Sequence, residues 1–375
     1  MPKPLTSSPS SAEATASAAN HLQPSNTSVG RTTEIKSEDR IALAPMEGVV
    51  DYHVRQLISE IGGLSFCVTE FLRITNQIQP AKSFKKVCPE ILHNSKTTSQ
   101  VPVHLQLLGN NVELIARHAS KAAMLGAEVV DLNFGCPAKT VNRHKGGAVL
   151  LQNPEEIHQI VSATAKALEG SGARLTAKMR LGYEDKNLAF ENLAAIQDGG
   201  ATELTVHART KVEGYKPPAH WHWIAKLKEK AHIPLIANGD VWSIEDYHNC
   251  REVSNCKDVM IGRGLIADPY LAYRIRHDIH EPPTPADLAA IILHYLWQIQ
   301  SDCPEKYLIS RVKQWLTMMK KQDPRMEALF EQAKICIKAE PMLQLIAALA
   351  QQERLFADRL PGDFNQRLNS YNLSR

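Results

Sequence analysis

A cysteine at the end of an expected strand is the first residue of this sequence that suggests chemistry. Cys136 lies in the segment DLNFGCPAKTVNRHKGG, residues 131–147. A run at 128–133 that reads as a strand is followed there by a glycine, the thiol and a proline. Structural cysteines normally sit inside apolar runs, whereas this thiol stands in a loop whose glycines allow the backbone to approach a ligand closely. The segment therefore predicts a thiol that meets a ligand.

Basic and amide side chains at the ends of other expected strands suit a flavin. Lys178 and His207 are donors that could face an electron-rich ring, and Gln106 could bind a flavin carbonyl or ring nitrogen. The segments ANGD at 237–240 and IGRG at 261–264 predict backbone amides that hold a phosphate. No G-x-G-x-x-G sequence follows an early strand, so a nicotinamide bound by a Rossmann fold is not indicated.

Short apolar runs recur from residue 41 onward, and these must position the polar side chains. They are IALAP at 41, FCVTE at 66, VPVHLQLLG at 101, EVVDLNFG at 128, LTAKMRLG at 175, ELTVHART at 203, PLIANGD at 234 and DVMIGRG at 258. Stretches with helical periodicity separate most of them, and eight βα repeats over about 230 residues predict a (β/α)8 TIM barrel at 39–282. The unusual polar residues would then converge at the carboxyl ends of the strands. An open doubly wound sheet is the alternative architecture.

Helical patterns replace this rhythm after about residue 283 and predict a small C-terminal helical bundle domain at 283–375. In KYLISRVKQWLTMMKK, residues 306–321, the apolar side chains share one helix face and Lys306, Lys313 and Lys320 share another. Such a basic face is typical of a solvated helix surface, so its role depends on what the barrel does.

Composition limits the function classes further. The net charge of +3 and the pI of about 8.4 mean that any nucleic-acid surface must be a local patch. Seven cysteines without regular spacing suit a reducing cytoplasm better than a disulfide framework or a zinc module. Residues 1–38 nearly lack large apolar side chains and predict a disordered tail. No apolar run approaches the roughly 20 residues needed to cross a bilayer. We expect a cytoplasmic monomer that binds neither a membrane nor a metal.

Six motifs together resemble those of the flavin-dependent tRNA-dihydrouridine synthases. They are APMEG at 44–48, NFGCP at 133–137, KMRLG at 178–182, VHART at 206–210, ANGD at 237–240 and IGRG at 261–264. Their order and spacing make the resemblance specific, and it extends from Ile41 to about Asp358. Within the family, the glutamate of APMEG, VCPEI at 87–91 and RVKQWL at 311–316 resemble the bacterial C-type subfamily. That subfamily is associated with uridine 16 of the tRNA D-loop.

The resemblance implies FMN as cofactor, NADPH as electron donor and tRNA as substrate. It implies FMN contacts for Pro45, Met46, Glu47, Gln106, Lys178, His207, Asn238, Gly239, Asp240, Gly262 and Arg263. It implies tRNA contacts for Arg73, Asn133, Tyr215, Lys306, Arg311 and Lys313. The chain departs from the pattern at Arg143, His144 and Lys145, where smaller residues are expected, and at Asp240, which replaces the glutamate of NGE. The first departure could alter how the catalytic loop moves, and the second should leave phosphate binding intact.

The implied reaction explains the thiol. Reduction of uridine to 5,6-dihydrouridine adds hydride to C6, which FMN would supply, and a proton to C5, which the resemblance assigns to Cys136. A cysteine with a pKa of about 8.5 is mostly protonated at neutral pH and can act as that acid. The uracil must also be turned out of the folded tRNA, and phosphate contacts from the basic helical domain would offset that cost.

Two alternative functions remain open from the sequence. The first is another FMN barrel that acts on a free pyrimidine, such as dihydroorotate or uracil, and would not require the basic helical domain. The second is an RNA-binding protein that keeps the fold without catalysis, against which the complete Cys136 and Lys178 motifs argue.

Overall fold

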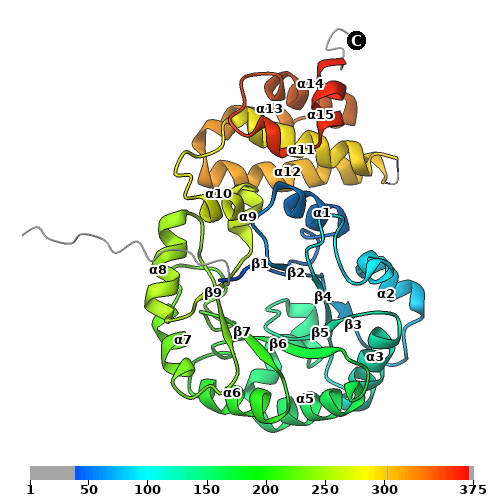
Figure 1. Cartoon of the computed structure of the whole chain (residues 1–375), viewed down its shortest axis with the longest axis vertical. Helices are drawn as coiled ribbons and strands as arrows, with labels where there is room; N and C mark the ends of the chain where they lie inside the picture. Colours follow the sequence, from blue (N-terminus) through cyan, green and yellow to red (C-terminus); the bar gives the residue numbers. More distant parts are fainter. Residues whose placement is uncertain (1–38, 302, 371–375) are drawn as a thin grey trace, which may run out of the picture. The chain divides into compact units, whose positions relative to one another are not determined.

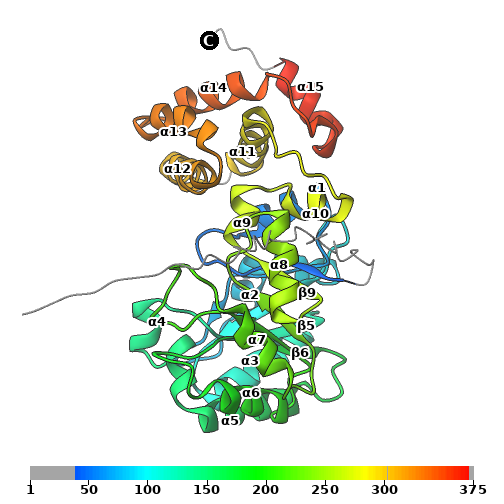
Figure 2. The same cartoon turned by 90° about the vertical axis from the view of Figure 1, so that its left-hand side faces the viewer.

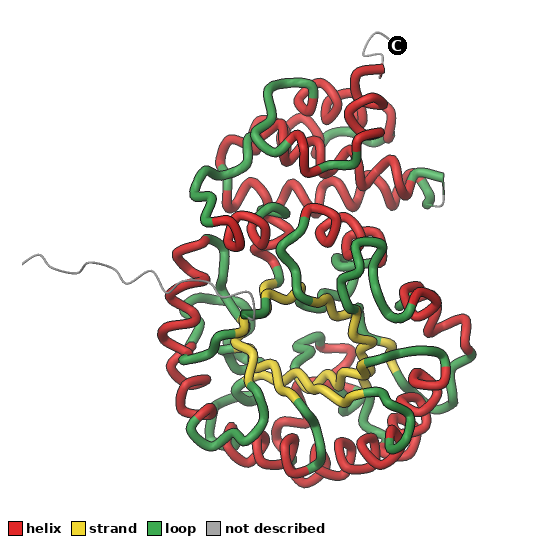
Figure 3. The backbone as a smooth tube through the Cα atoms, viewed as in Figure 1, coloured by secondary structure: helices red, strands yellow, loops and turns green. Residues whose placement is uncertain are grey.

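A computed structural model of the chain describes residues 39–301 and 303–370. The expected disordered tail at 1–38 and the last five residues of the expected helical domain lie outside these ranges. Within them, eight parallel strands form a closed ring (Figures 1 and 3). These strands are β1 (Ile41–Leu43), β2 (Phe66–Val68), β4 (Val103–Leu108), β5 (Val129–Phe134), β6 (Arg174–Arg180), β7 (Glu203–His207), β8 (Leu235–Asn238) and β9 (Asp258–Ile261).

Pairing between the first and last strands closes the ring. Strand β1 pairs in parallel with β9 on one side and with β2 on the other, and β2 pairs with β4. The TIM barrel is therefore confirmed, and the open doubly wound sheet is excluded because no barrel strand is left at an edge. The sequence did not predict the two-residue strand β3 (Leu72–Arg73). It pairs in parallel with the carboxyl end of β4, and Leu72 lies opposite Leu107.

Alternation along the strands sends apolar side chains outward and polar ones inward. On β5, Val130, Leu132 and Phe134 belong to the large apolar core under the helices, whereas Asp131 and Asn133 alternate with them and are also buried. The inward positions carry Gln106, Asp131, Asn133, Thr176, Lys178, Thr205, His207 and Asn238, which adjoin one another in register across β4 to β8. The interior of the barrel thus becomes polar toward the carboxyl ends of its strands.

Helices surround the ring, and several begin at side-chain caps. The barrel helices are α1 (Tyr52–Ile61), α2 (Ala81–Val87), α3 (Val112–Met124), α4 (Lys139–Arg143), α5 (Pro154–Leu168), α6 (Ala189–Asp198), α7 (Trp221–Lys228), α8 (Ile244–Ser254), α9 (Arg263–Ala267) and α10 (Leu271–His277). Short 3-10 segments follow α2 at Pro89–His93 and α4 at Gly147–Gln152. The side chains of Asp51, Asn111 and Ser243 accept hydrogen bonds from the first turns of α1, α3 and α8, which satisfies otherwise unpaired amides.

The chain continues after the barrel as helices packed on one another. They are α11 (Pro285–Ile299), α12 (Glu305–Gln322), α13 (Glu327–Lys334), α14 (Ala339–Ala350) and α15 (Gly362–Ser370), with 3-10 segments at Pro324–Met326 and Ala357–Arg359. Helix α14 packs on α11, and α13 packs on α12 (Figure 2). Helices α11 and α12 contact α1 and α9 of the barrel respectively. No helix in the described residues has the length and apolar character needed to span a membrane.

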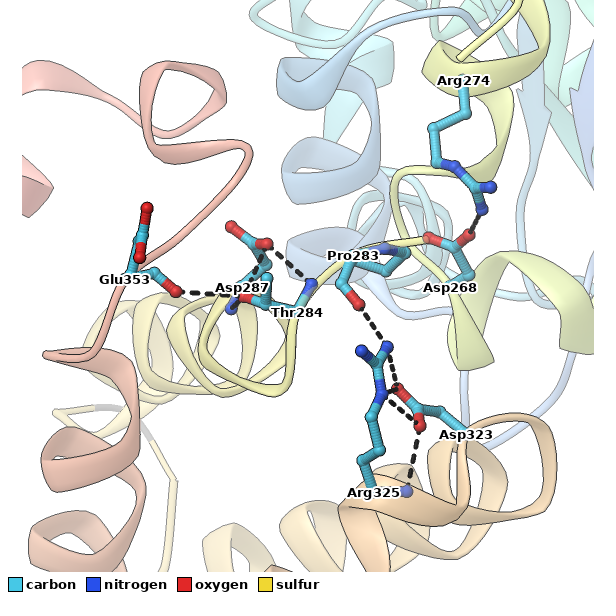
Figure 4. A network of polar contacts seen from close by, with 8 residues as sticks. All are labelled: Asp268, Arg274, Pro283, Thr284, Asp287, Asp323, Arg325 and Glu353. Atoms are coloured by element: carbon cyan, nitrogen blue, oxygen red, sulfur yellow. Dashed lines mark hydrogen bonds and ion pairs between the residues drawn. The ribbon is translucent and has the colours of Figure 1, made fainter. Parts of the chain in front are cut away.

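Polar contacts fix the segment that joins the barrel to these helices (Figure 4). Thr284 and Asp287 form a capping box at the start of α11. The carboxylate of Asp287 also accepts hydrogen bonds from the backbone amides of Leu355 and Phe356, at 3.1 and 2.9 Å. From the next helical layer, Arg325 donates to the carbonyl oxygen of Pro283 at 2.8 Å. Residues from two later segments of the chain, at Arg325 and at 355–356, therefore hold this junction by hydrogen bonds.

Candidate active site

A cavity of about 430 Å³ opens at the carboxyl ends of the barrel strands. Every residue that the sequence assigned to the cofactor lines it, and so do Cys136, Asn133 and Tyr215. The lining also includes Phe71, Arg180, Trp242 and, from α12, Met318. The polar residues at the strand exits therefore converge as the barrel pattern predicted.

Cys136 begins a loop that closes back on itself. Its amide donates to Oδ1 of Asn133 at 2.9 Å, and its carbonyl oxygen accepts from the Ala148 amide at 3.1 Å and the Asn142 side chain at 2.9 Å. A Cβ at Gly147 would lie 2.9 Å from that carbonyl oxygen, and the φ of this glycine is +68°. Desolvation raises the pKa of the Cys136 thiol, so the thiol stays protonated at neutral pH.

Nitrogen donors form one wall of the cavity. The Lys178 ammonium donates to Oδ1 of Asn238 at 2.9 Å, and Asn238 donates to the Met260 carbonyl oxygen at 2.8 Å. Desolvation, followed by the charge of Arg180, lowers the pKa of Lys178 to about 7. Desolvation also lowers the pKa of His207 well below its ordinary value, so that the buried imidazole is neutral.

Glycines and arginines form another part of the cavity. The Asp240 carboxylate accepts from Arg263 at 3.2 Å and also pairs with the fully buried Arg209. Gly239 has a φ of +122°, and a Cβ at Gly262 would lie 3.4 Å from the sulfur of Met46. Asp240 therefore orients two guanidinium groups, and Gly239 and Gly262 line the same cavity without a side chain of their own.

Arg180 is a cavity residue that the sequence assignment left out. It is 2 % exposed, donates to the carbonyl oxygens of Gly135, Thr210 and Gly214 at 2.8 to 3.1 Å, and lies over the ring of Tyr215 at 5.2 Å. The guanidinium of Arg263 lies 4.7 Å from the same ring. The signal was present in the sequence, because Arg180 follows Lys178 by two residues and so shares its face of β6.

The predicted tRNA residues do not share one environment. Asn133 and Tyr215 line the cavity, and Tyr215 is 52 % exposed. Arg73 lies outside it and donates to the Thr140 carbonyl oxygen in α4 at 3.4 Å, close to the Cys136 loop. The departing residues Arg143, His144 and Lys145 are exposed at the end of the same short helix.

Arg311 was expected to face tRNA, but its side chain lies inside the molecule. The residue is 3 % exposed and donates to Tyr295 Oη at 3.0 Å, to Asp51 at 3.0 Å, and to the carbonyl oxygens of Gly48 and Val49. The reason is its place on α12, since it falls on the same stripe as the buried side chains Leu308, Val312 and Trp315. Arg311 therefore connects α12 to the loop after β1.

The lysines of α12 also differ from one another. Lys306 is exposed, whereas Lys313 donates to the Cys336 carbonyl oxygen at 2.9 Å and Lys320 to Glu327 at 3.0 Å. Among these three, Lys306 has the side chain most available to an outside phosphate.

Comparison with known proteins identifies the family. The sequence model of the family described as dihydrouridine synthase (Dus) matches residues 42–352. The chain belongs to the dihydrouridine synthase family. The family and the enzyme class that the six motifs predicted are thus confirmed.

Curated relatives in this family match over almost their whole length. The tRNA-dihydrouridine(16) synthase of Aquipseudomonas alcaligenes is 43 % identical over 312 residues, which cover 82 % of this chain and 99 % of the relative. The enzyme of the same name from Neisseria meningitidis serogroup A is 44 % identical over 328 residues, which cover 86 % of this chain and 98 % of the relative. A third, from Pseudomonas syringae pv. tomato, is 46 % identical over 299 residues, 78 % of this chain and 93 % of the relative.

Proposed function

We propose that this chain is a cytoplasmic, flavin-dependent enzyme that reduces uridine 16 in the D-loop of tRNA to 5,6-dihydrouridine. The substrate and the position follow the name that its curated Dus relatives share, tRNA-dihydrouridine(16) synthase. The observation that carries the chemistry is one cavity lined by a protonated thiol at Cys136, the Lys178 ammonium and the glycine-containing segments that follow β8 and β9. In this proposal residues 39–282 form the catalytic domain and residues 283–375 the tRNA-binding domain.

The residues present fit FMN. The Lys178 ammonium has one neutral acceptor, Asn238, and a partly buried cation in such a setting is suited to an electron-rich ring. Nδ1 of His207 is buried without a hydrogen-bond partner among the described residues, as are Nε and Nη1 of Arg209. Gly239, Gly262 and Arg263 would hold the phosphate, while Pro45, Met46, Glu47 and Gln106 would contact the ring or ribityl chain.

The other parts of the reaction, proton donation, charge stabilisation and contact with the uracil, fall to residues of this chain. The hydride for C6 of the uracil would come from bound FMN that NADPH has reduced. Cys136 donates its proton to C5, which balances the addition, and the raised pKa of its thiol keeps that proton available at neutral pH. Lys178, charged below about pH 7 in the free protein, can hold negative charge beside it. Asn133, Arg180 and Tyr215, which line the same cavity, would surround the uracil.

Binding of tRNA would extend beyond the cavity. Arg73 beside the Cys136 loop and the exposed Lys306 on α12 would meet phosphates, and Lys313 would add positive charge. Together these contacts would offset the few kcal/mol typically needed to unstack a base. Arg311 would support this surface from inside rather than touch the RNA.

Purified protein tests the proposal directly. We expect a yellow protein whose released chromophore has the mass of FMN, and NADPH oxidation that depends on tRNA lacking dihydrouridine. Free uridine or uracil at the same concentration should not replace the tRNA. Equal activity on the free pyrimidine would instead support an FMN barrel for small substrates, and a colourless protein that binds tRNA would support a non-catalytic role.

A further inference from the structure

Asp131 is a buried carboxylate that does not line the cavity. It lies on β5, is 4 % exposed, and stands opposite Gln106 on β4 and Thr176 on β6 in the strand register. Its Oδ1 accepts from the Thr176 hydroxyl at 2.6 Å, and its Oδ2 accepts from Nε2 of Gln106 at 2.7 Å. The carboxylate therefore lies behind the cavity lining and is hydrogen-bonded to Gln106, which lines the cavity.

The hydrogen bonds from Asp131 to the cysteine loop run in one direction. Backbone amides can only donate, so the oxygen held by Gly135 and Cys136 at 2.9 Å must be Oδ1 of Asn133. Nδ2 of Asn133 then donates to Oε1 of Gln106 at 2.7 Å, which leaves Nε2 of Gln106 to donate to the carboxylate. Each donor in this relay meets an acceptor only while Asp131 accepts.

We propose that Asp131 is a positioning residue for the reaction, acting on Cys136 through the side chains of Gln106 and Asn133. The catalytic role in this inference rests on the proposed function, whereas the hydrogen-bond geometry is independent of that function. If the carboxylate did not fix Gln106, the amide could turn over and place Nε2 against Nδ2 of Asn133. Asn133 cannot turn in response because two backbone amides hold its oxygen.

The charge on Asp131 is compatible with its burial. Desolvation raises the pKa of Asp131 to about 6, while the hydrogen bonds from Thr176 and Gln106 and the charge of Lys178 oppose that rise. The carboxylate is therefore ionised at neutral pH and accepts at both oxygens. Each of Gln106 and Asn133 keeps a second amide hydrogen, and both side chains line the cavity.

The relay can be tested by moving the negative charge from position 131 to its hydrogen-bonding neighbour at position 106. In Gln106→Glu, two carboxylates face each other where an amide and a carboxylate now lie 2.7 Å apart. Such a pair binds a proton more readily than either group alone, and a protonated carboxyl at position 106 would donate as the amide does, so alkylation is measured at pH 9. In the double variant Gln106→Glu with Asp131→Asn, the new amide donates to the new carboxylate and accepts from Thr176, so the direction at Asn133 is restored. The readout is the alkylation rate of Cys136 by iodoacetamide in flavin-free protein, measured by peptide mass spectrometry with Cys336 as the internal reference.

The relay predicts a specific order of rates. Gln106→Glu should alkylate at Cys136 about tenfold faster than the native protein, the scale of one lost buried hydrogen bond, and the double variant should return to within about twofold. Asp131→Asn alone should stay within about threefold, because the asparagine can present its oxygen to Gln106. Thr176→Val, which removes the other partner of Asp131 without reversing any donor, is the matched control and should also stay near native.

A double variant as fast as Gln106→Glu, or a native rate in Gln106→Glu, would overturn the proposal. If Gln106→Glu does not fold, Asn133→Asp, alone and combined with Asp131→Asn, gives the same test. The carboxylate that Asn133→Asp introduces turns Gln106 around, and the amide that Asp131→Asn introduces can then donate to the Gln106 oxygen. Neither flavin nor tRNA enters the alkylation assay, so its result stands even if dihydrouridine is never formed. In the flavin-loaded enzyme, uridine reduction at saturating tRNA should be restored in the double variant relative to Gln106→Glu.

Discussion

Arg311 of α12 donates a hydrogen bond of 2.6 Å from Nη2 to the carbonyl oxygen of Val49 in the loop that follows β1. The same loop carries Met46 and Glu47 into the cavity. A buried side chain of the helical domain thus supports a wall of the candidate active site, so the two parts of the chain depend on each other through this contact.

Arg311→Met should lower the free energy of unfolding by about 3 kcal/mol, because it leaves the half-buried Asp51 carboxylate without its cationic partner and the carbonyl oxygens of Gly48 and Val49 without this donor. It should also weaken retention of the flavin. Urea unfolding and the fraction of FMN bound after dialysis measure the two effects. The slope of tRNA affinity against salt concentration should not change, since the guanidinium is not at the surface.

Lys306→Ala is the matched variant on the same helix. Lys306 is exposed, so its removal should leave stability within about 0.5 kcal/mol of native. It should reduce the salt slope of tRNA binding by about one phosphate contact, which is about 0.7 to 0.9. A reduced slope in Arg311→Met with native stability would contradict the structural assignment of Arg311.

Cys136→Ala should retain bound flavin and its reduction by NADPH but form dihydrouridine about 100-fold to 10,000-fold more slowly, the range typical for loss of a general acid. Cys336→Ala, which removes a free cysteine outside the cavity, is the control and should keep native activity. Rapid-mixing absorbance of the flavin separates the two half-reactions. Native dihydrouridine formation in Cys136→Ala would remove the thiol from the mechanism.

Gly147→Ala should slow dihydrouridine formation, because the added methyl group would press on the carbonyl oxygen and Cβ of Cys136, at 2.9 and 3.0 Å. Gly170 also has a positive φ, of +73°, but has nothing within 4 Å of an added Cβ. Gly170→Ala should therefore share the backbone strain, about 1 kcal/mol, without the loss of activity. Equal rates in the two variants would show that the Cys136 loop tolerates displacement.

The pKa of Lys178 gives a prediction about stability in flavin-free protein. Its pKa is about 7 in the folded state and 10.5 as the ordinary value, so the unfolded chain binds more protons between these limits. The native protein should therefore gain stability relative to Lys178→Met as the pH rises from about 7 toward 10.5. Urea unfolding of both proteins at pH 7 and pH 9 measures this difference, and equal differences at the two pH values would contradict the desolvated setting of Lys178.

Strand positions were predictable because apolar runs in a parallel barrel are long enough to recognise. All eight runs, from IALAP at 41 to DVMIGRG at 258, correspond to barrel strands. The two-residue strand β3 was missed, because its pairing with the end of β4 depends on tertiary contact rather than on local sequence.

Site residues were predictable where they lie near the carboxyl end of a strand, and less so where tertiary packing decides the position of the side chain. Gln106, Lys178 and His207 line the cavity because the carboxyl ends of the strands converge there. Arg311 is different. Helical periodicity places it in the apolar stripe with Leu308 and Trp315, and a basic residue in such a stripe is buried only where hydrogen-bond acceptors face its side chain. Those partners, the carbonyl oxygens after β1, lie more than 200 residues away and are invisible to a local pattern.

The central claim is best tested by expressing this chain in bacteria that lack all endogenous dihydrouridine synthases and mapping dihydrouridine in their tRNA. We predict dihydrouridine at position 16 with the native chain and its loss with Cys136→Ala. A folded, flavin-containing protein that forms none at position 16, or forms it elsewhere in the tRNA, would contradict the claim.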